Sequence, residues 1–160
     1  MSELLFWRGL PRVRFGGDIW FSTEGISIRM ASDASASRWG GHTMEDAPQY
    51  AREYFSEEES AQSSTYRELL GVFRCLQSMV HLCEGKFLVF NAGAHNLLWV
   101  VNRGSPRLLL NELARELFWF CLERRLILMI EWVSREENSL ADELSKLIIL
   151  DDWMLKRVLF

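Results

Sequence analysis

Cysteine and proline are scarce in this sequence, with three residues of each type. Cys75, Cys83 and Cys121 form an odd set without metal-ligand spacing, and each lies in a stretch with a helical apolar pattern. This pattern indicates buried, reduced thiols rather than a disulfide framework or a metal site.

Long apolar runs are also absent. No segment approaches the roughly 18 consecutive apolar residues that are needed to span a membrane. The amino terminus, MSELLFWRGL, carries Glu3 where a secretory signal peptide would have a basic region. We therefore expect no membrane partner and a cytoplasmic or nuclear location.

The chain has no excess of positive charge, because its formal net charge is -4. This balance argues against a protein that holds nucleic acid by bulk charge alone. Local basic clusters remain possible contacts for nucleic acid, one formed by Arg8, Arg12 and Arg14 and another by Arg103, Arg107, Arg124 and Arg125.

What is present is the composition of one ordered domain, with 160 residues, of which 49% are hydrophobic and 25% are charged. Period-two and buried apolar patterns predict strands at 26–33, 38–44, about 52–55, 86–91 and 126–133. Helical patterns predict helices from 65 to Gly85, at 95–102, from Pro106 to 125, and at 135–146, with Gly104 ending the second of them. The polar residues at 57–64 predict a loop. This order predicts an α/β layer with an antiparallel hairpin at the front and parallel crossovers behind it.

Three acids stand at informative positions of this pattern. Asp33 ends the first strand, Glu68 lies in the first turn of the first long helix, and Asp142 lies on the last helix. If the first strand is central, these carboxylates converge at one end of the sheet, where they repel unless cations or protons intervene. Mg²⁺ prefers oxygen ligands, and two such ions about 4 Å apart can cleave a phosphodiester. In the alternative interpretation, Glu68 closes a capping box with Thr65, Asp142 is solvated, and Asp33 forms an Asx turn.

The segments around these acids resemble a known family. MASDASASRWGGH, SSTYRELLGV and IEWVSREENSLADELSK look like the ribonuclease H domain of retroelement reverse transcriptases, particularly the tyrosine-recombinase (DIRS-like) group. The resemblance covers residues 25–147, with 1–24 as a lead-in from the preceding reverse-transcriptase connection and 148–160 as a tail. It implies a ribonuclease H-like fold, with a five-stranded mixed sheet flanked by helices.

The resemblance also implies a substrate, a cofactor and partners. In active members, two Mg²⁺ or Mn²⁺ ions hydrolyse the RNA strand of an RNA-DNA hybrid. Asp33 would bridge both ions, Glu68 would bind one and position the attacking water, and Asp142 would bind the other. The reverse-transcriptase portion of a larger polyprotein would be a further partner.

One position departs from the family pattern. The resemblance places a fourth acid at the end of the fourth strand, where this chain has Gly93, which offers no side-chain oxygen. Asn91 and His95 lie two residues to either side, and neither replaces a carboxylate well as a ligand of Mg²⁺; Asn91 and Asn96 can equally serve the turn and the helix cap. The loop 134–137 also lacks the histidine that many cellular relatives carry. Candidate substrate-contacting residues are Ser35, Asn91, Asn96, Arg135 and Asn138.

Four hypotheses remain open at this stage. The first is a ribonuclease H domain that is impaired or inactive because Gly93 replaces an acid. The second is an active enzyme in which Asn91, a water or the substrate phosphate completes the metal shell. The third is a binding module for nucleic acid or protein that needs no metal. The fourth, a transposase or integrase relative, fits poorly because LADELSK presents Asp142 where those enzymes usually have a Glu in another context.

Overall fold

The computed structural model describes residues 27–146. The predicted lead-in, the predicted tail and the basic cluster of Arg8, Arg12 and Arg14 lie outside the described residues. Within the described range, no helix is both long enough and apolar enough to cross a membrane.

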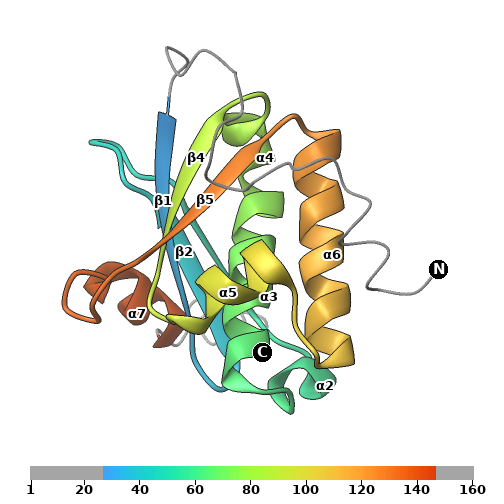
Figure 1. The fold of residues 1–160 in the computed structure, drawn as a ribbon. Helices are drawn as coiled ribbons and strands as arrows, with labels where there is room; N and C mark the ends of the chain where they lie inside the picture. Colours follow the sequence, from blue (N-terminus) through green and yellow to red (C-terminus); the bar gives the residue numbers. More distant parts are fainter. Residues whose placement is uncertain (1–26, 147–160) are drawn as a thin grey trace, which may run out of the picture.

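A five-stranded mixed sheet forms the centre of the fold (Figure 1). Its strands lie in the order β3-β2-β1-β4-β5. The pairs β1·β2 and β2·β3 are antiparallel, whereas β1·β4 and β4·β5 are parallel. The predicted antiparallel front hairpin and parallel crossovers are therefore confirmed, with strands at Ser27–Ala34, Arg38–Thr43, Tyr50–Tyr54, Phe87–Ala92 and Ile127–Trp132.

Helices cover both faces of this sheet. α3 (Ser64–Ser78), α5 (Asn96–Arg103) and α6 (Leu108–Glu123) lie on one side, and α7 (Ser139–Lys146) lies on the other (Figure 1). Two adjacent glycines of β2 show why the layers pack so closely. A Cβ on Gly40 would lie 2.6 Å from Leu144 of α7, and a Cβ on Gly41 would lie 2.4 Å from the Sγ of Cys75 in α3. Successive strand residues point to opposite faces, so each glycine admits one helix against the sheet.

The start of α3 differs from the predicted capping box. Ser63 is the N-cap, and its Oγ accepts a hydrogen bond from the Tyr66 N–H at 3.2 Å. Thr65 already lies inside the helix, so its pairing with Glu68 is wrong. A capping box does form between Ser56 and Glu59, and it starts the short helix α2 (Glu57–Ser60) within the predicted polar loop. The consequence is that the Glu68 side chain is not used in a cap.

Three other helix boundaries were predicted incorrectly. The first long helix breaks at Met79, and a separate short helix, α4 (Val80–Cys83), precedes Gly85. Pro106 lies before α6, whose N-cap is the extended residue Arg107. The last helix starts at Ser139, because residues 135–138 form a turn. Gly104 ends α5 as predicted, with a φ of 77° that few side-chain-bearing residues adopt.

The core lies between the sheet and the α3/α6 layer. Its largest fully buried side chains include Phe90, Met30, Leu69, Leu76 and Leu88. The three cysteines are buried and free, which confirms the predicted reduced thiols.

The second basic cluster predicted from the sequence does not form. Arg103 and Arg107 lie before α6, and Arg124 and Arg125 lie after it. Sixteen helical residues at about 1.5 Å each separate the two pairs by roughly 24 Å. They are therefore two separate basic sites at opposite ends of one helix.

Candidate active site at the end of strand β1

Asp33 and Glu68 form the centre of the candidate site. Asp33 is the penultimate residue of β1, and Glu68 lies in the second turn of α3, which packs against that strand. Burial and the nearby Asp33 carboxylate raise the pKa of Glu68 to about 8, against smaller lowering effects from a backbone hydrogen bond at Ala34 and from Arg67 and Arg135. The Glu68 Oε2 is buried and has no hydrogen-bond partner in the structure. The two carboxyl groups are therefore near enough to interact electrostatically, and Glu68 is largely protonated around pH 7.

Ser145 fixes the orientation of Asp33 from the other face of the sheet. Its Oγ lies 2.8 Å from the Asp33 Oδ2 and 2.9 Å from the Asp142 carbonyl oxygen, and the residue is fully buried. The hydroxyl thus links α7 to the end of β1. Sequence reasoning missed Ser145, although it lies one helical turn after Asp142 in the LADELSK segment.

Arg67 is a second residue that sequence reasoning missed. Its Nε donates to the Ser35 carbonyl at 3.1 Å, and its Nη1 donates to the carbonyls of Ser60 and Gln62 at 3.1 and 2.6 Å. One guanidinium therefore joins the turn after β1 to the loop between α2 and α3. This holds the backbone on both sides of the Asp33 and Glu68 pair.

Asp142 lies at the edge of the site and is paired with cations. Its Oδ2 accepts from the Lys146 Nζ at 2.5 Å, and its Oδ1 lies 3.6 Å from the Arg135 Nε. Among residues 27–146, no group of three or more His, Cys, Asp and Glu side chains is placed so that it could hold a metal ion. The structure thus brings Asp33 and Glu68 together and connects Asp142 to them through Ser145.

Gly93 directly faces Asp33. Ser32 pairs with Ala92 across the parallel β1·β4 ladder, so the next residues, Asp33 and Gly93, are neighbours at the strand ends. A Cβ placed on Gly93 would lie 3.8 Å from the Asp33 Oδ1 and 3.9 Å from the Asn138 Nδ2. These are ordinary van der Waals distances, so the position has room for a Cβ beside the Asp33 carboxylate.

Asn138 and Arg135 belong to the turn before α7. The Asn138 Nδ2 donates to the Ser32 carbonyl at 3.0 Å and so fastens this turn to β1, while its buried Oδ1 has no hydrogen-bond partner. The Asn138 carbonyl accepts from the Asp142 N–H at 3.0 Å in the first turn of α7. Arg135 is exposed and faces Asp142. Both residues therefore lie beside the acids.

The remaining candidate contact residues differ in their surroundings. The Ser35 Oγ accepts from the Arg38 N–H at 3.1 Å, which is a turn contact. Asn91 is buried, and its amide contacts Arg29 and the sulfur of Met44. Asn96 is exposed in the first turn of α5. Only Asn96 among these three presents an exposed side chain next to the site.

The donor set determines which cations the site fits. Asp33 and Glu68 offer hard carboxylate oxygens, and the buried Glu68 Oε2 without a hydrogen-bond partner suits a cation between the pair. Gly93 offers no side-chain oxygen, and Asp142 is paired with Lys146 and Arg135, although its buried Oδ1 has no hydrogen-bond partner. The donor set therefore fits a divalent cation held by Asp33 and Glu68, with Asp142 as a further acid at the edge of the site.

The strand order, the mixture of antiparallel and parallel pairs and the helices on both faces define a ribonuclease H-like fold. The chain is similar in structure to LC11-RNase H1 in complex with an RNA/DNA hybrid, with 16% identity and a TM-score of 0.62 over 73% of this chain and 92% of that one. It is also similar to RNase H1 from the halophilic archaeon Halobacterium salinarum NRC-1, with 12% identity and a TM-score of 0.58 over 74% and 94% of the two chains.

A reverse transcriptase shares the same fold over a smaller part of its length. The foamy viral protease-reverse transcriptase in complex with double-stranded DNA matches 69% of this chain with 12% identity and a TM-score of 0.53, and the match spans 24% of the viral chain. No protein-family model and no curated protein matches this sequence. At these identities, the likeness shows the fold.

Proposed function

We propose that this chain is a ribonuclease H domain of a retroelement reverse transcriptase, related to the DIRS-like group, that binds RNA-DNA hybrid and cleaves its RNA strand weakly or not at all. The position of Gly93 carries this proposal. Its Cβ position points at the Asp33 carboxylate at 3.8 Å, in the place where the family resemblance puts a metal-binding acid. The natural partners would be the hybrid and the reverse-transcriptase portion of a larger polyprotein, in the cytoplasm or the nucleus.

The named acids have distinct roles in this proposal. Asp33, oriented by Ser145, and Glu68 would hold one Mg²⁺ or Mn²⁺ ion, which when bound would supply Lewis acidity at a substrate phosphate. Glu68 has to lose its proton to act as a ligand, because its pKa is about 8 in the free protein. Asp142 would remain paired with Lys146 and Arg135 at the edge of the site.

The expected activity is close to background. A missing ligand in a two-metal centre removes several kcal/mol of transition-state stabilisation, and each 1.36 kcal/mol is about tenfold in rate. The test is cleavage of an end-labelled RNA-DNA hybrid with Mg²⁺ or Mn²⁺, followed on a denaturing gel. Brisk cleavage by the natural chain that Asp33→Asn abolishes would contradict an impaired enzyme. It would favour a complete site in which the substrate phosphate or a water supplies the missing ligand.

Asn91 is a poor candidate for that missing ligand. Its Oδ1 accepts from an Arg29 guanidinium at 3.4 Å, and its Nδ2 contacts the sulfur of Met44 at 3.3 Å. A cation at this oxygen would compete with the positively charged Arg29 guanidinium. Asn91→Ala is therefore expected to leave any residual cleavage unchanged.

A non-catalytic recognition module is the second candidate function. The cation pairing of Asp142 favours it, because Lys146 and Arg135 give this carboxylate partners without a metal. Such a module would bind hybrid in the presence of EDTA with an affinity that falls as salt concentration rises. Residual cleavage that Asp33→Asn removes would exclude this candidate, whereas binding without any metal-dependent cleavage would support it.

A further inference from the structure

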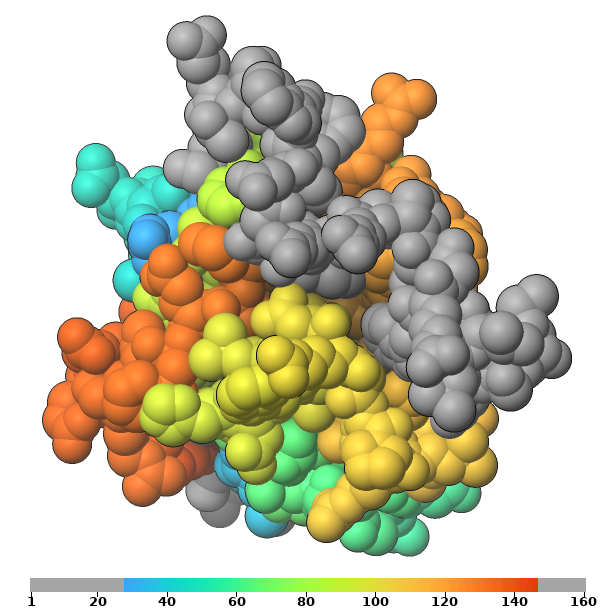
Figure 2. All heavy atoms as spheres, in the orientation of Figure 1, coloured from blue at the N-terminus to red at the C-terminus, as the bar shows by residue number. Residues whose placement is uncertain are grey.

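A row of exposed aromatic and basic side chains starts beside Gly93 and follows α5. It consists of His95, Trp99 and Arg103, which are spaced by four residues, together with Trp132 from the end of β5. We call these four residues the α5 stripe. His95 precedes α5 and already has helical backbone angles, so residues 95, 99 and 103 lie on one face of the helix. Figure 2 shows α5 on the surface beside the segment that leads into α7.

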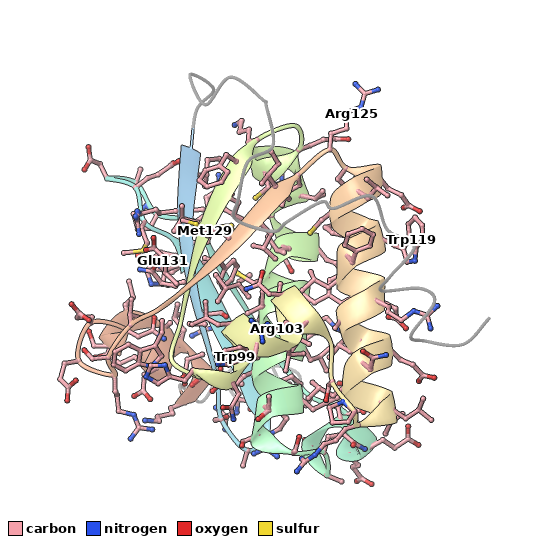
Figure 3. The ribbon with its side chains drawn as sticks, viewed as in Figure 1. Trp99, Arg103, Trp119, Arg125, Met129 and Glu131 are labelled. Carbon is pink, nitrogen blue, oxygen red and sulfur yellow. The ribbon has the colours of Figure 1, made fainter. Side chains whose placement is uncertain are left out.

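Ring contacts join the members of the α5 stripe. The rings of His95 and Trp132 stack with centroids 4.1 Å apart and an angle of 13° between their planes. The Arg103 guanidinium lies 4.5 Å from the centroid of the Trp99 ring, and both side chains are labelled on α5 in Figure 3. Trp99 is 60% exposed and Trp132 is 43% exposed. These rings are therefore ordered by their neighbours and still accessible to a ligand.

The position of the α5 stripe connects it to the candidate active site. The Trp132 Nε1 donates to the Gly93 carbonyl at 3.2 Å, so the first ring pair lies against the residue that faces Asp33. From His95 to Arg103, eight residues at about 1.5 Å each extend roughly 12 Å along the helix. For comparison, successive bases of a stacked strand are about 3.4 Å apart, so the helix face is long enough for a few nucleotides.

The charge of this part of the chain complements a polyanion. Residues 85–111 contain no Asp or Glu, although the whole chain has 22 of them. Arg103 and Arg107 of this segment lie at and after the end of α5, whereas Lys86 lies before the start of β4 and so away from the α5 stripe. Arg103 thus presents a positive charge at the end of the α5 stripe, and residues 85–111 around it contain no acid. This charge suits a phosphate.

We propose that the α5 stripe binds the unpaired bases of a single-stranded nucleic acid by stacking, with Trp99 as the main contact and Arg103 on the backbone phosphate. An exposed aromatic ring needs an exposed base face, and bases inside a duplex have both faces covered by their neighbours, whereas a single strand leaves them free. The inference rests on the proposed function in one respect only, which is that the bound strand continues past the Asp33 and Glu68 pair. Binding itself requires neither a metal nor cleavage.

The test measures binding of a fluorescently labelled 12-nucleotide single-stranded RNA by anisotropy in EDTA. Trp99→Ala should weaken binding by about five- to a hundredfold, the effect of losing one stacked base. Trp99→Phe should retain most of the affinity, because a smaller ring still stacks. Trp119→Ala is the matched control, since Trp119 is 44% exposed on α6 and lies apart from Trp99 (Figure 3); it should leave binding unchanged.

Three results would overturn the inference. The first is unchanged binding by Trp99→Ala, and the second is no measurable binding of single-stranded RNA by the natural chain. The third is an equal loss of affinity for the single strand and for a blunt RNA-DNA hybrid, because that would indicate a contact with the backbone rather than with free bases. Thermal unfolding of Trp99→Ala should match the natural chain, since an exposed ring adds little stability. The assay contains EDTA, so a failure of hydrolysis does not affect it.

Discussion

The Cβ position of Gly93 lies 3.8 Å from the Asp33 Oδ1, at the point where the parallel strands β1 and β4 end side by side. The backbone of Gly93 is not left-handed, because the positive φ angles of glycines among residues 27–146 are those of Gly85 and Gly104. A Cβ at position 93 is therefore sterically tolerated and would lie beside the Asp33 carboxylate, a proposed cation ligand.

Gly93→Asp should raise cleavage of RNA-DNA hybrid by at least about tenfold in Mg²⁺ or Mn²⁺, because it adds an anionic ligand beside Asp33. Gly93→Asn is the matched control, with the same shape and no charge, and should give a much smaller rise. Initial rates on a labelled hybrid measure both. Equal rates for Gly93→Asp and the natural chain would show that position 93 does not limit activity.

Glu68 should make stability depend on pH. Its pKa is about 8 in the folded protein and 4.5 in the reference state, so between these values the folded state holds a proton that the unfolded chain releases. The free energy of unfolding should therefore fall as pH rises through this window. Glu68→Gln removes the titration, so the variant should gain stability relative to the natural chain at pH 9 and show a smaller difference at pH 5. Urea unfolding at pH 5, 7 and 9 measures this.

The same pair of carboxyl groups should respond to divalent cations. At pH 8, added Mg²⁺ or Mn²⁺ should raise the melting temperature of the natural chain, because a ligand that binds only the folded state stabilises it. Asp33→Asn and Glu68→Gln should each reduce this rise. An equal rise in all three proteins would place the cation elsewhere.

Ser145→Ala should destabilise the fold by about 1.5–3 kcal/mol, because it removes a buried hydrogen bond to the Asp33 carboxylate. Ser78→Ala is the control. The Ser78 Oγ also makes a hydrogen bond, to the Arg74 carbonyl at 2.8 Å, but it is exposed at the end of α3, so its loss should cost less than about 0.5 kcal/mol. Equal effects of the two changes in urea unfolding would contradict a specific link between Ser145 and Asp33.

Gly40→Ala should loosen the contact between α7 and the sheet. The new methyl would lie 2.6 Å from the backbone and Cβ of Leu144, so α7 has to move, at a cost of about 1–3 kcal/mol or more. Gly71→Ala is the comparison, because its nearest neighbour, the Trp39 Cβ, is 3.4 Å away and α3 gains up to about 1 kcal/mol of helix propensity. A Gly40→Ala protein with unchanged stability would mean that α7 packs less closely than the structure shows.

The thiols should be inert in the folded protein. Burial raises the pKa of Cys83 to about 11 and of Cys121 to about 12, and it raises the pKa of Cys75 further still. At pH 8, a disulfide reagent such as dithionitrobenzoate should modify none of them within minutes, whereas all three should react in urea. Rapid modification of the folded chain would indicate that the α3/α6 layer opens readily.

The order of the elements followed from the sequence, because apolar periodicity depends on local geometry alone. Alternation over residues 26–33 predicted β1, and the spacing of Leu69, Val72, Phe73 and Leu76 predicted α3. The starts of helices were less predictable, since the SSTYRE and SEEE segments both contain cap-like spacings. Ser63 and Ser56 are the residues that cap, because only their side chains reach the free N–H groups in the folded chain.

The sequence by itself determined which acids are present, that Gly93 lacks one, and that the chain makes an α/β layer. The tertiary structure decided which of these residues meet. Pairing across β1 and β4 puts Gly93 against Asp33, packing of α3 brings Glu68 to the same point, and α7 contributes the Ser145 hydroxyl from 112 residues away. The structure also pairs Asp142 with Lys146. It places the arginines of the predicted basic cluster at opposite ends of α6, so the cluster is divided. Contacts between residues so distant along the chain depend on sheet register and helix packing, and local sequence patterns do not encode those distances.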